Sequence, residues 1–201
     1  MIGLRKAAAF YRGYYFKHAA ELNYNFNIYL IPIFTKKINK MGKNNNLTIF
    51  RLNTKLFINC IEGITEEQSN ATISSDTNSI KWVAAHIIWA RYNASSIMGN
   101  PPANNPYIGL FEDFRPTNKE DDYKTITEIK EEWKKASDLL ENSFSKIEPD
   151  FWEKEAPIKF PLLGDDSNAG LITFFAQHES FHLGQLAILK KAIVGISMKY
   201  Q

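Results

Sequence analysis

The chain has 201 residues, of which 44% are apolar and 13% aromatic, so it can bury the core of one domain, with or without an appendage. Its single cysteine, Cys60, excludes an intrachain disulfide and a cysteine-rich zinc site. The net charge of +2 is too small to create the positive field expected of a nucleic-acid-binding protein.

The first forty residues differ from the rest of the chain in charge. They contain seven Lys and Arg residues against the single acid Glu21, and many Phe and Tyr residues. Their apolar runs are too short and too interrupted for a signal peptide or a membrane span, so we predict a cytoplasmic protein without a transmembrane segment. We expect residues 1–40 to be an extension outside the core and residues 41–201 to form the folded domain. A basic helix over Leu4–Glu21 that lies on a membrane surface is the alternative for the extension.

The first helix of this domain is predicted between Leu47 and Ile64, where apolar residues recur with helical period. Asn53 falls on the same inward-facing stripe. An inward asparagine is usually a hydrogen-bonded core residue, and the alternative is a polar contact near a pocket. Asn53 is therefore a candidate substrate-binding residue.

A second helix is predicted over residues 80–98. Trp82, His86 and Trp89 follow one another at steps of four and three and therefore share one face, which should be buried. A single histidine in such a place is more often a hydrogen-bonded core residue than a metal ligand. His86 becomes a candidate ligand because two further histidines lie on another predicted helix.

Residues 99–121 form a connection rich in Pro and Asn, and a loop of this length is uncommon in a compact domain. It is long enough to cross the length of a helix bundle, so the helices on either side of it can run parallel. Its aromatic residues are candidates for covering a pocket: Tyr107, Phe111 and Phe114. Two more amphipathic helices are predicted over residues 123–147 and 169–194. Four such helices indicate an all-α fold, a four-helix bundle with a long connection between its second and third helices.

The fourth predicted helix carries the strongest chemical signal, because His178 and His182 are four residues apart. Four residues advance a helix by about 400°, so the two imidazoles lie on one face at a spacing that suits a single metal ion. Such a pair also arises by chance. Gln185 follows His182 by three residues and shares its face, which makes it a second candidate substrate-binding residue.

The sequence from His178 to His182 also matches the His-Glu-x-x-His signature of zinc proteases, with Glu179 as the general base. A zinc protease needs a third ligand, usually downstream, and no Asp, Glu or further His follows His182. A third protein ligand must therefore come from upstream. Glu179 can be a surface carboxylate, a catalytic base or a residue that orients a ligand, and we rank these alternatives in that order.

If the second and fourth helices are neighbours, His86 can face His178 and His182. Three imidazoles suit a borderline divalent ion such as Zn²⁺ or Ni²⁺. Three protein ligands leave one position open for water or substrate, which is the catalytic arrangement. A metal held in this way lowers the pKa of a bound water or thiol and yields a nucleophile near neutral pH.

These residues resemble those of a known family. Asn78-Ser79-Ile80-x-Trp82-x-x-x-His86 together with His178-x3-His182-x-Gly184-Gln185 is similar to the motifs of the DinB-like, YfiT-related metal-binding bundles. The resemblance covers about residues 45–194. It implies an up-down-down-up bundle, a metal site made by His86, His178 and His182, and in many members a homodimer.

The resemblance also implies a range of functions. Some members of the family are thiol S-transferases or isomerases that use bacillithiol, mycothiol or glutathione, and many have no assigned reaction. We therefore expect a metal-dependent enzyme that transfers a low-molecular-weight thiol to a small-molecule electrophile. The alternatives are a non-catalytic bundle that binds a metal or a partner in a stress response, and a metal-dependent hydrolase. A nucleic-acid partner is disfavoured because residues 41–201 have a net negative charge.

Overall fold

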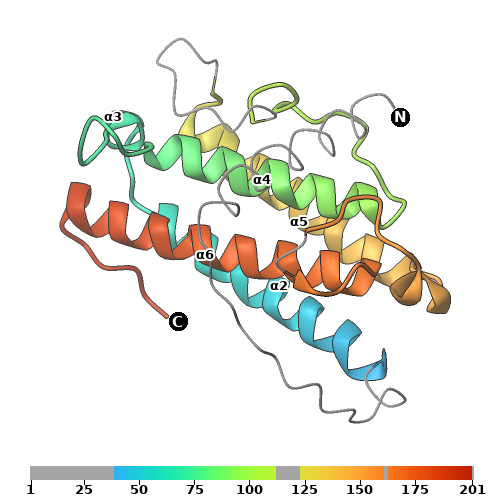
Figure 1. Ribbon diagram of the computed structural model, residues 1–201. Helices are drawn as coiled ribbons and strands as arrows, with labels where there is room; N and C mark the ends of the chain where they lie inside the picture. Colours follow the sequence, from blue (N-terminus) through green and yellow to red (C-terminus); the bar gives the residue numbers. More distant parts are fainter. Residues whose placement is uncertain (1–38, 112–122, 161–162, 201) are drawn as a thin grey trace, which may run out of the picture.

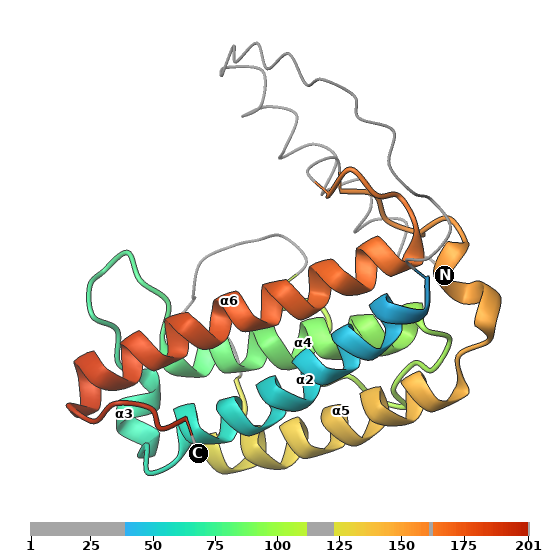
Figure 2. The same cartoon turned by 90° about the horizontal axis from the view of Figure 1, so that it is seen from below.

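Four long helices make up most of the described part of the protein (Figures 1 and 2). The computed structural model describes residues 39–111, 123–160 and 163–200. The long helices are α2 (Asn39–Ile61), α4 (Ile80–Ile97), α5 (Ile126–Lys146) and α6 (Asn168–Val194). A short helix, α3 (Glu66–Asn70), precedes α4, and a 3₁₀ helix, η1 (Pro149–Glu153), follows α5. No strand lies within the described ranges, so the predicted all-α bundle is confirmed.

The helix boundaries agree with the sequence prediction to within three residues except at the start of α2. This helix begins at Asn39, eight residues before the predicted Leu47. The prediction missed this start because residues 40–46 contain one large apolar residue, Met41, and so no apolar period. Residues 1–38, most of the predicted extension, and Phe114 in the long connection lie outside the described residues. The division of the chain at residue 40 stays a prediction.

The helices run up, down, down and up, as the family resemblance implies. At one end, Glu66 pairs with Lys81 near the start of α4 and accepts a hydrogen bond from the Ile126 N–H at the start of α5. At the same end, Lys190 of α6 donates to the carbonyl oxygens of Asn59 and Glu62, where α2 finishes. Thus α4 and α5 are parallel, and so are α2 and α6. Figure 1 shows the same directions in the colours of the helices.

Side chains at the helix starts explain where three of the long helices begin. The hydroxyl oxygens of Ser79, Thr125 and Ser167 accept hydrogen bonds from backbone N–H groups of the first turns of α4, α5 and α6. Thr125 and Glu128 form a reciprocal capping box. At the other end of α6, Gly195 adopts a left-handed conformation with φ 77°, which ends the helix.

The centre of the bundle contains a buried ion pair between Arg91 of α4 and Glu179 of α6. Arg91 Nε donates to Glu179 Oε2 at 2.8 Å and Nη2 donates to Oε1. The remaining guanidinium hydrogens go to the Thr54 hydroxyl and the Phe50 carbonyl oxygen on α2 and to the Ser137 hydroxyl on α5. One side chain therefore bonds to all three of the other long helices. All five of its N–H donors have an acceptor.

The guanidinium group also stacks on an aromatic ring. Arg91 Cζ lies 3.7 Å from the centre of the Trp133 ring, and Trp133 itself stacks on Phe57 with ring centres 4.0 Å apart. The apolar residues around this network come from all four long helices and form one continuous core. Phe57, Cys60 and Ile129 are fully buried in it.

No described helix is long and apolar enough to cross a membrane.

Removing the charge of Arg91 is expected to destabilise the bundle strongly. Arg91→Leu should lower the free energy of unfolding by about 3–5 kcal/mol, because the Glu179 carboxylate would stay buried without its partner. The measurement is urea denaturation followed by circular dichroism. The matched control is Arg51→Leu, since Arg51 and its partner Glu141 are 60% and 48% exposed and their pair should contribute nothing measurable. Equal losses in the two variants would contradict the central role of Arg91.

Two glycines of α6 should respond to alanine with opposite signs. A Cβ on Gly170 would lie 2.6 Å from the backbone carbonyl oxygen of Asp165, whereas a Cβ on Gly184 would meet nothing within 4 Å. Gly170→Ala should cost about 1–3 kcal/mol of stability. Gly184→Ala should add about 0.5–1 kcal/mol, because alanine suits a helix interior better than glycine. Thermal unfolding of both variants checks the pair, and changes of the same sign would refute the packing described here.

Candidate metal centre

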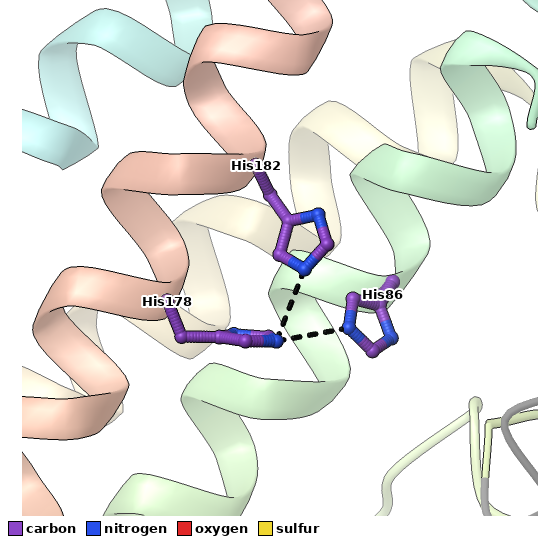
Figure 3. A group of neighbouring side chains, drawn as sticks. All are labelled: His86, His178 and His182. Carbon is purple, nitrogen blue, oxygen red and sulfur yellow. Dashed lines mark hydrogen bonds between the residues drawn. The ribbon is translucent and has the colours of Figure 1, made fainter. Parts of the chain in front are cut away.

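Three histidines from two helices converge in the structure (Figure 3). His86 comes from α4, and His178 and His182 come from α6. The Nε2 atom of His178 lies 3.2 Å from that of His86 and 3.0 Å from that of His182. The three candidate ligand atoms all lie within 4.8 Å of one another. The structure thus brings together the three histidines that the sequence analysis selected.

The His86 ring is held between two tryptophans. It stacks on Trp82 with ring centres 5.0 Å apart and an interplanar angle of 16°, and on Trp89 at 5.5 Å and 23°. The spacing of these residues on α4 produces this arrangement, because steps of four and three place the rings one above the other on one face. The two indoles fix the plane of the imidazole and so the direction of its Nε2 lone pair.

His182 is oriented by a hydrogen bond instead. Its Nδ1–H donates to Gln185 Oε1 at 2.7 Å, one turn further along α6. This bond places the proton on Nδ1 and leaves Nε2 free to act as a ligand. The Nδ1 atoms of His86 and His178 are buried and have no hydrogen-bond partner within the described part of the chain.

The environment keeps all three imidazoles neutral near pH 7. Burial, together with the neighbouring His178 and His182, lowers the pKa of His86 well below its usual value. Burial lowers the pKa of His178 to about 3, and it also lowers that of His182 against the opposing effect of the bond to Gln185. A neutral imidazole has the lone pair that a metal ion needs, so no proton has to be displaced before binding.

The donor set fits a divalent metal ion. Each neutral imidazole has one proton for its two nitrogens, so the three Nε2 atoms at the centre cannot all satisfy one another by hydrogen bonding. A cation bound to the three lone pairs would satisfy all of them at once. Three nitrogen ligands on rigid helices are typical of zinc and nickel sites that keep a further position open.

A cavity of about 370 Å³ lies beside the three histidines. Besides them, its walls are formed by Trp82 of α4, by Phe111 of the long connection, and by Phe174, Gln177 and Phe181 of α6. We expected an aromatic residue of the connection to cover a pocket, and Phe111 lines this cavity. The sequence analysis missed the three cavity residues of α6. Phe174 and Phe181 lie four residues before and three residues after His178, and this spacing, which puts them on its face, would have identified them. Gln177 directly precedes His178, so no such spacing marks it.

The two candidate substrate-binding residues lie away from this cavity. Gln185 is occupied by its bond to His182 and is not among the lining residues. Asn53 donates from its side-chain amide to the Ser180 hydroxyl at 3.0 Å, and it lines a different hollow of about 500 Å³ between α2 and α6, the α2–α6 groove. The structure therefore places neither side chain where it would contact a molecule beside the histidines.

The leading interpretation of Glu179 as a surface carboxylate is wrong. Its side chain is 2% exposed and paired with Arg91. Burial raises the pKa of the Glu179 carboxyl, and the hydrogen bonds from Arg91 oppose that shift. The helical period alone could not reveal this burial, because α6 packs against both α2 and α4 and so hides more than one of its faces.

Comparison with known proteins places the chain in a family. No curated protein matches the sequence. A family model described as the DinB superfamily matches residues 49–186, which include parts of all four long helices and all three histidines. The chain belongs to the DinB superfamily.

Proposed function

We propose that this DinB-superfamily protein is a metal-dependent enzyme that joins a small thiol to a small electrophile. The observation that carries the proposal is a cluster of three converging imidazole nitrogens with a cavity directly beside it. A divalent ion at these nitrogens, Zn²⁺ or Ni²⁺, would act as a Lewis acid that makes the thiol easier to deprotonate. The reaction is a substitution: the S–H proton goes to solvent, a sulfur–carbon bond forms, and the leaving group departs with its electron pair.

In this proposal the chain's own residues hold the ligand nitrogens in position. His86, His178 and His182 hold their nitrogens in place before the reaction begins, which limits the reorganisation needed in the transition state. The only cysteine is not the source of the thiol. Cys60 is fully buried, and burial raises the pKa of its thiol to about 11, so a thiolate is scarce there at neutral pH.

Two observations favour this proposal over its alternatives. A non-catalytic site would be closed by a fourth protein ligand, whereas the cluster found among the described residues has three and adjoins a cavity. A metal-dependent hydrolase would need a general base, and the carboxylate of Glu179 is bonded through both oxygens to Arg91. Glu179 therefore has a structural role in this proposal. A homodimer and a location in the cytoplasm stay predictions.

Metal content is the first test. The purified protein should hold about one equivalent of zinc or nickel by elemental analysis, and His178→Ala should lose it because two imidazoles rarely hold a divalent ion firmly. The matched control is Gln177→Ala, which changes the neighbouring residue of the same helix and should keep the metal. A wild-type protein that stays metal-free after soaking with zinc and with nickel would refute the site.

Thiol transfer is the second test. The metal-loaded protein should accelerate the reaction of bacillithiol, mycothiol or glutathione with a chromogenic electrophile such as 1-chloro-2,4-dinitrobenzene, followed by absorbance. His182→Ala should reduce the rate at least 100-fold, on the scale of losing a metal ligand. Cys60→Ala should leave the rate unchanged. Transfer that survives in His182→Ala, or vanishes in Cys60→Ala, would count against the proposal.

A further inference from the structure

The cavity beside the histidines is aromatic and carries no formal charge on its walls. Four of its eight lining residues are Trp or Phe, three are the neutral histidines, and the remaining one is Gln177. No Lys, Arg, Asp or Glu lines it within the part of the chain that the structure describes. In the protein without a bound ion, a carboxylate or phosphate that entered would lose its water without gaining a charged partner from these walls, which is costly.

Three of the four aromatic walls are held firmly by other rings. Trp82 stacks on His86, and Phe174 stacks on Phe160 with ring centres 4.2 Å apart and an interplanar angle of 23°. Phe111 meets the edges or faces of Trp82 and His86 at 5.3 and 5.1 Å. Walls of this kind are formed in advance and present flat, apolar faces to a ligand.

The fourth wall, Phe181, is 57% exposed although it is a large apolar side chain. It lies beside His182, with ring centres 5.2 Å apart, and it lines the cavity together with the other aromatic rings. A flat molecule in the cavity would cover part of the Phe181 ring and remove that surface from water, which is favourable. The residue is thus placed to contact a ligand at the mouth of the cavity.

We propose that this cavity binds the uncharged, flat aromatic part of the electrophile, with Phe181 as a specificity-determining residue. The inference rests on the proposed function, and it assigns the two reactants to different places. The aromatic electrophile lies against the rings, while the charged groups of the thiol stay outside the cavity in solvent. A volume of about 370 Å³ lies near the lower end of the range for small-molecule sites and suits one or two fused rings.

The test is a binding measurement on the full chain after removal of metal with a chelator, and it needs no turnover. The neutral two-ring dye 6-propionyl-2-dimethylaminonaphthalene emits at shorter wavelength in apolar surroundings, so a fluorescence titration gives its Kd. The anionic comparison dye is 6-dimethylaminonaphthalene-2-carboxylate, which keeps the same two rings and carries a carboxylate where the neutral dye has its ketone. We expect one-site binding of the neutral dye with a blue shift, and at least tenfold weaker binding of the anionic dye.

Two variants of α6 locate the bound dye. Phe181→Ala should raise the Kd of the neutral dye at least fivefold. Ile188→Ala is the matched control, because Ile188 is also an exposed apolar residue of α6, at 65%, but lines the α2–α6 groove. Its Kd should equal that of the wild type, and both side chains are exposed enough for the variants to fold.

Three outcomes would overturn the inference: equal or tighter binding of the anionic dye, an unchanged Kd in Phe181→Ala, or loss of binding in Ile188→Ala. These outcomes are separate from those that refute the proposed function. If the dye binds as expected but metal-loaded protein transfers no thiol, the reaction is wrong and the ligand class stands. If transfer occurs without the expected dye binding, the ligand class is wrong and the reaction stands.

Discussion

The position of every functional side chain depends on the buried pair between Arg91 and Glu179. A charge in the core is tolerated only when its hydrogen bonds are complete, and Arg91 completes them with acceptors from α2, α5 and α6. Glu179 directly follows His178 in the chain. Once the carboxylate is fixed in the core, the rotation of α6 about its own axis is fixed too, and His178 and His182 must face α4. The same pair fixes the position of α4 along the axis of the bundle, and α4 carries His86 five residues before Arg91.

Two hollows lie along α6, and they differ in the side chains that line them. The cavity beside the histidines lies toward α4 and is lined mainly by rings. The α2–α6 groove is lined mainly by aliphatic side chains, and its other lining residues include Asn53, Lys191 and Tyr200. The three histidines and the aromatic cavity therefore share one face of α6, and the groove on its other side has no histidine. This separation explains why Asn53, although inward-facing as predicted, is remote from the site.

The bundle and the three histidines could be predicted from sequence because both follow from helical geometry. A His-x3-His pair must share a face, and the step from Trp82 to His86 to Trp89 must stack their side chains. Helical geometry did not predict the burial of Glu179, since a periodic pattern shows which residues share a face of a helix but not how many of its faces are buried. It also gave no information about the start of α2, where the single apolar residue Met41 makes no periodic pattern. The position of Phe111 beside the histidines could not be predicted, because the path of a long connection depends on the surfaces that it crosses.

The parallel direction of α4 and α5 has a consequence for how such proteins diverge. Parallel neighbours cannot be joined by a tight turn, so the chain must travel the length of the bundle between residues 98 and 125, and on the way it delivers Phe111 to the cavity. The three histidines, by contrast, sit on α4 and α6, and the ring contact that the described part of the crossover makes with them is that of Phe111 with His86, at 5.1 Å. Substitutions in the crossover can thus change what the cavity accepts while His178 and His182 keep their places on α6. Ligand preference and the arrangement of the histidines can therefore diverge with one point of contact between them, that of Phe111 with His86.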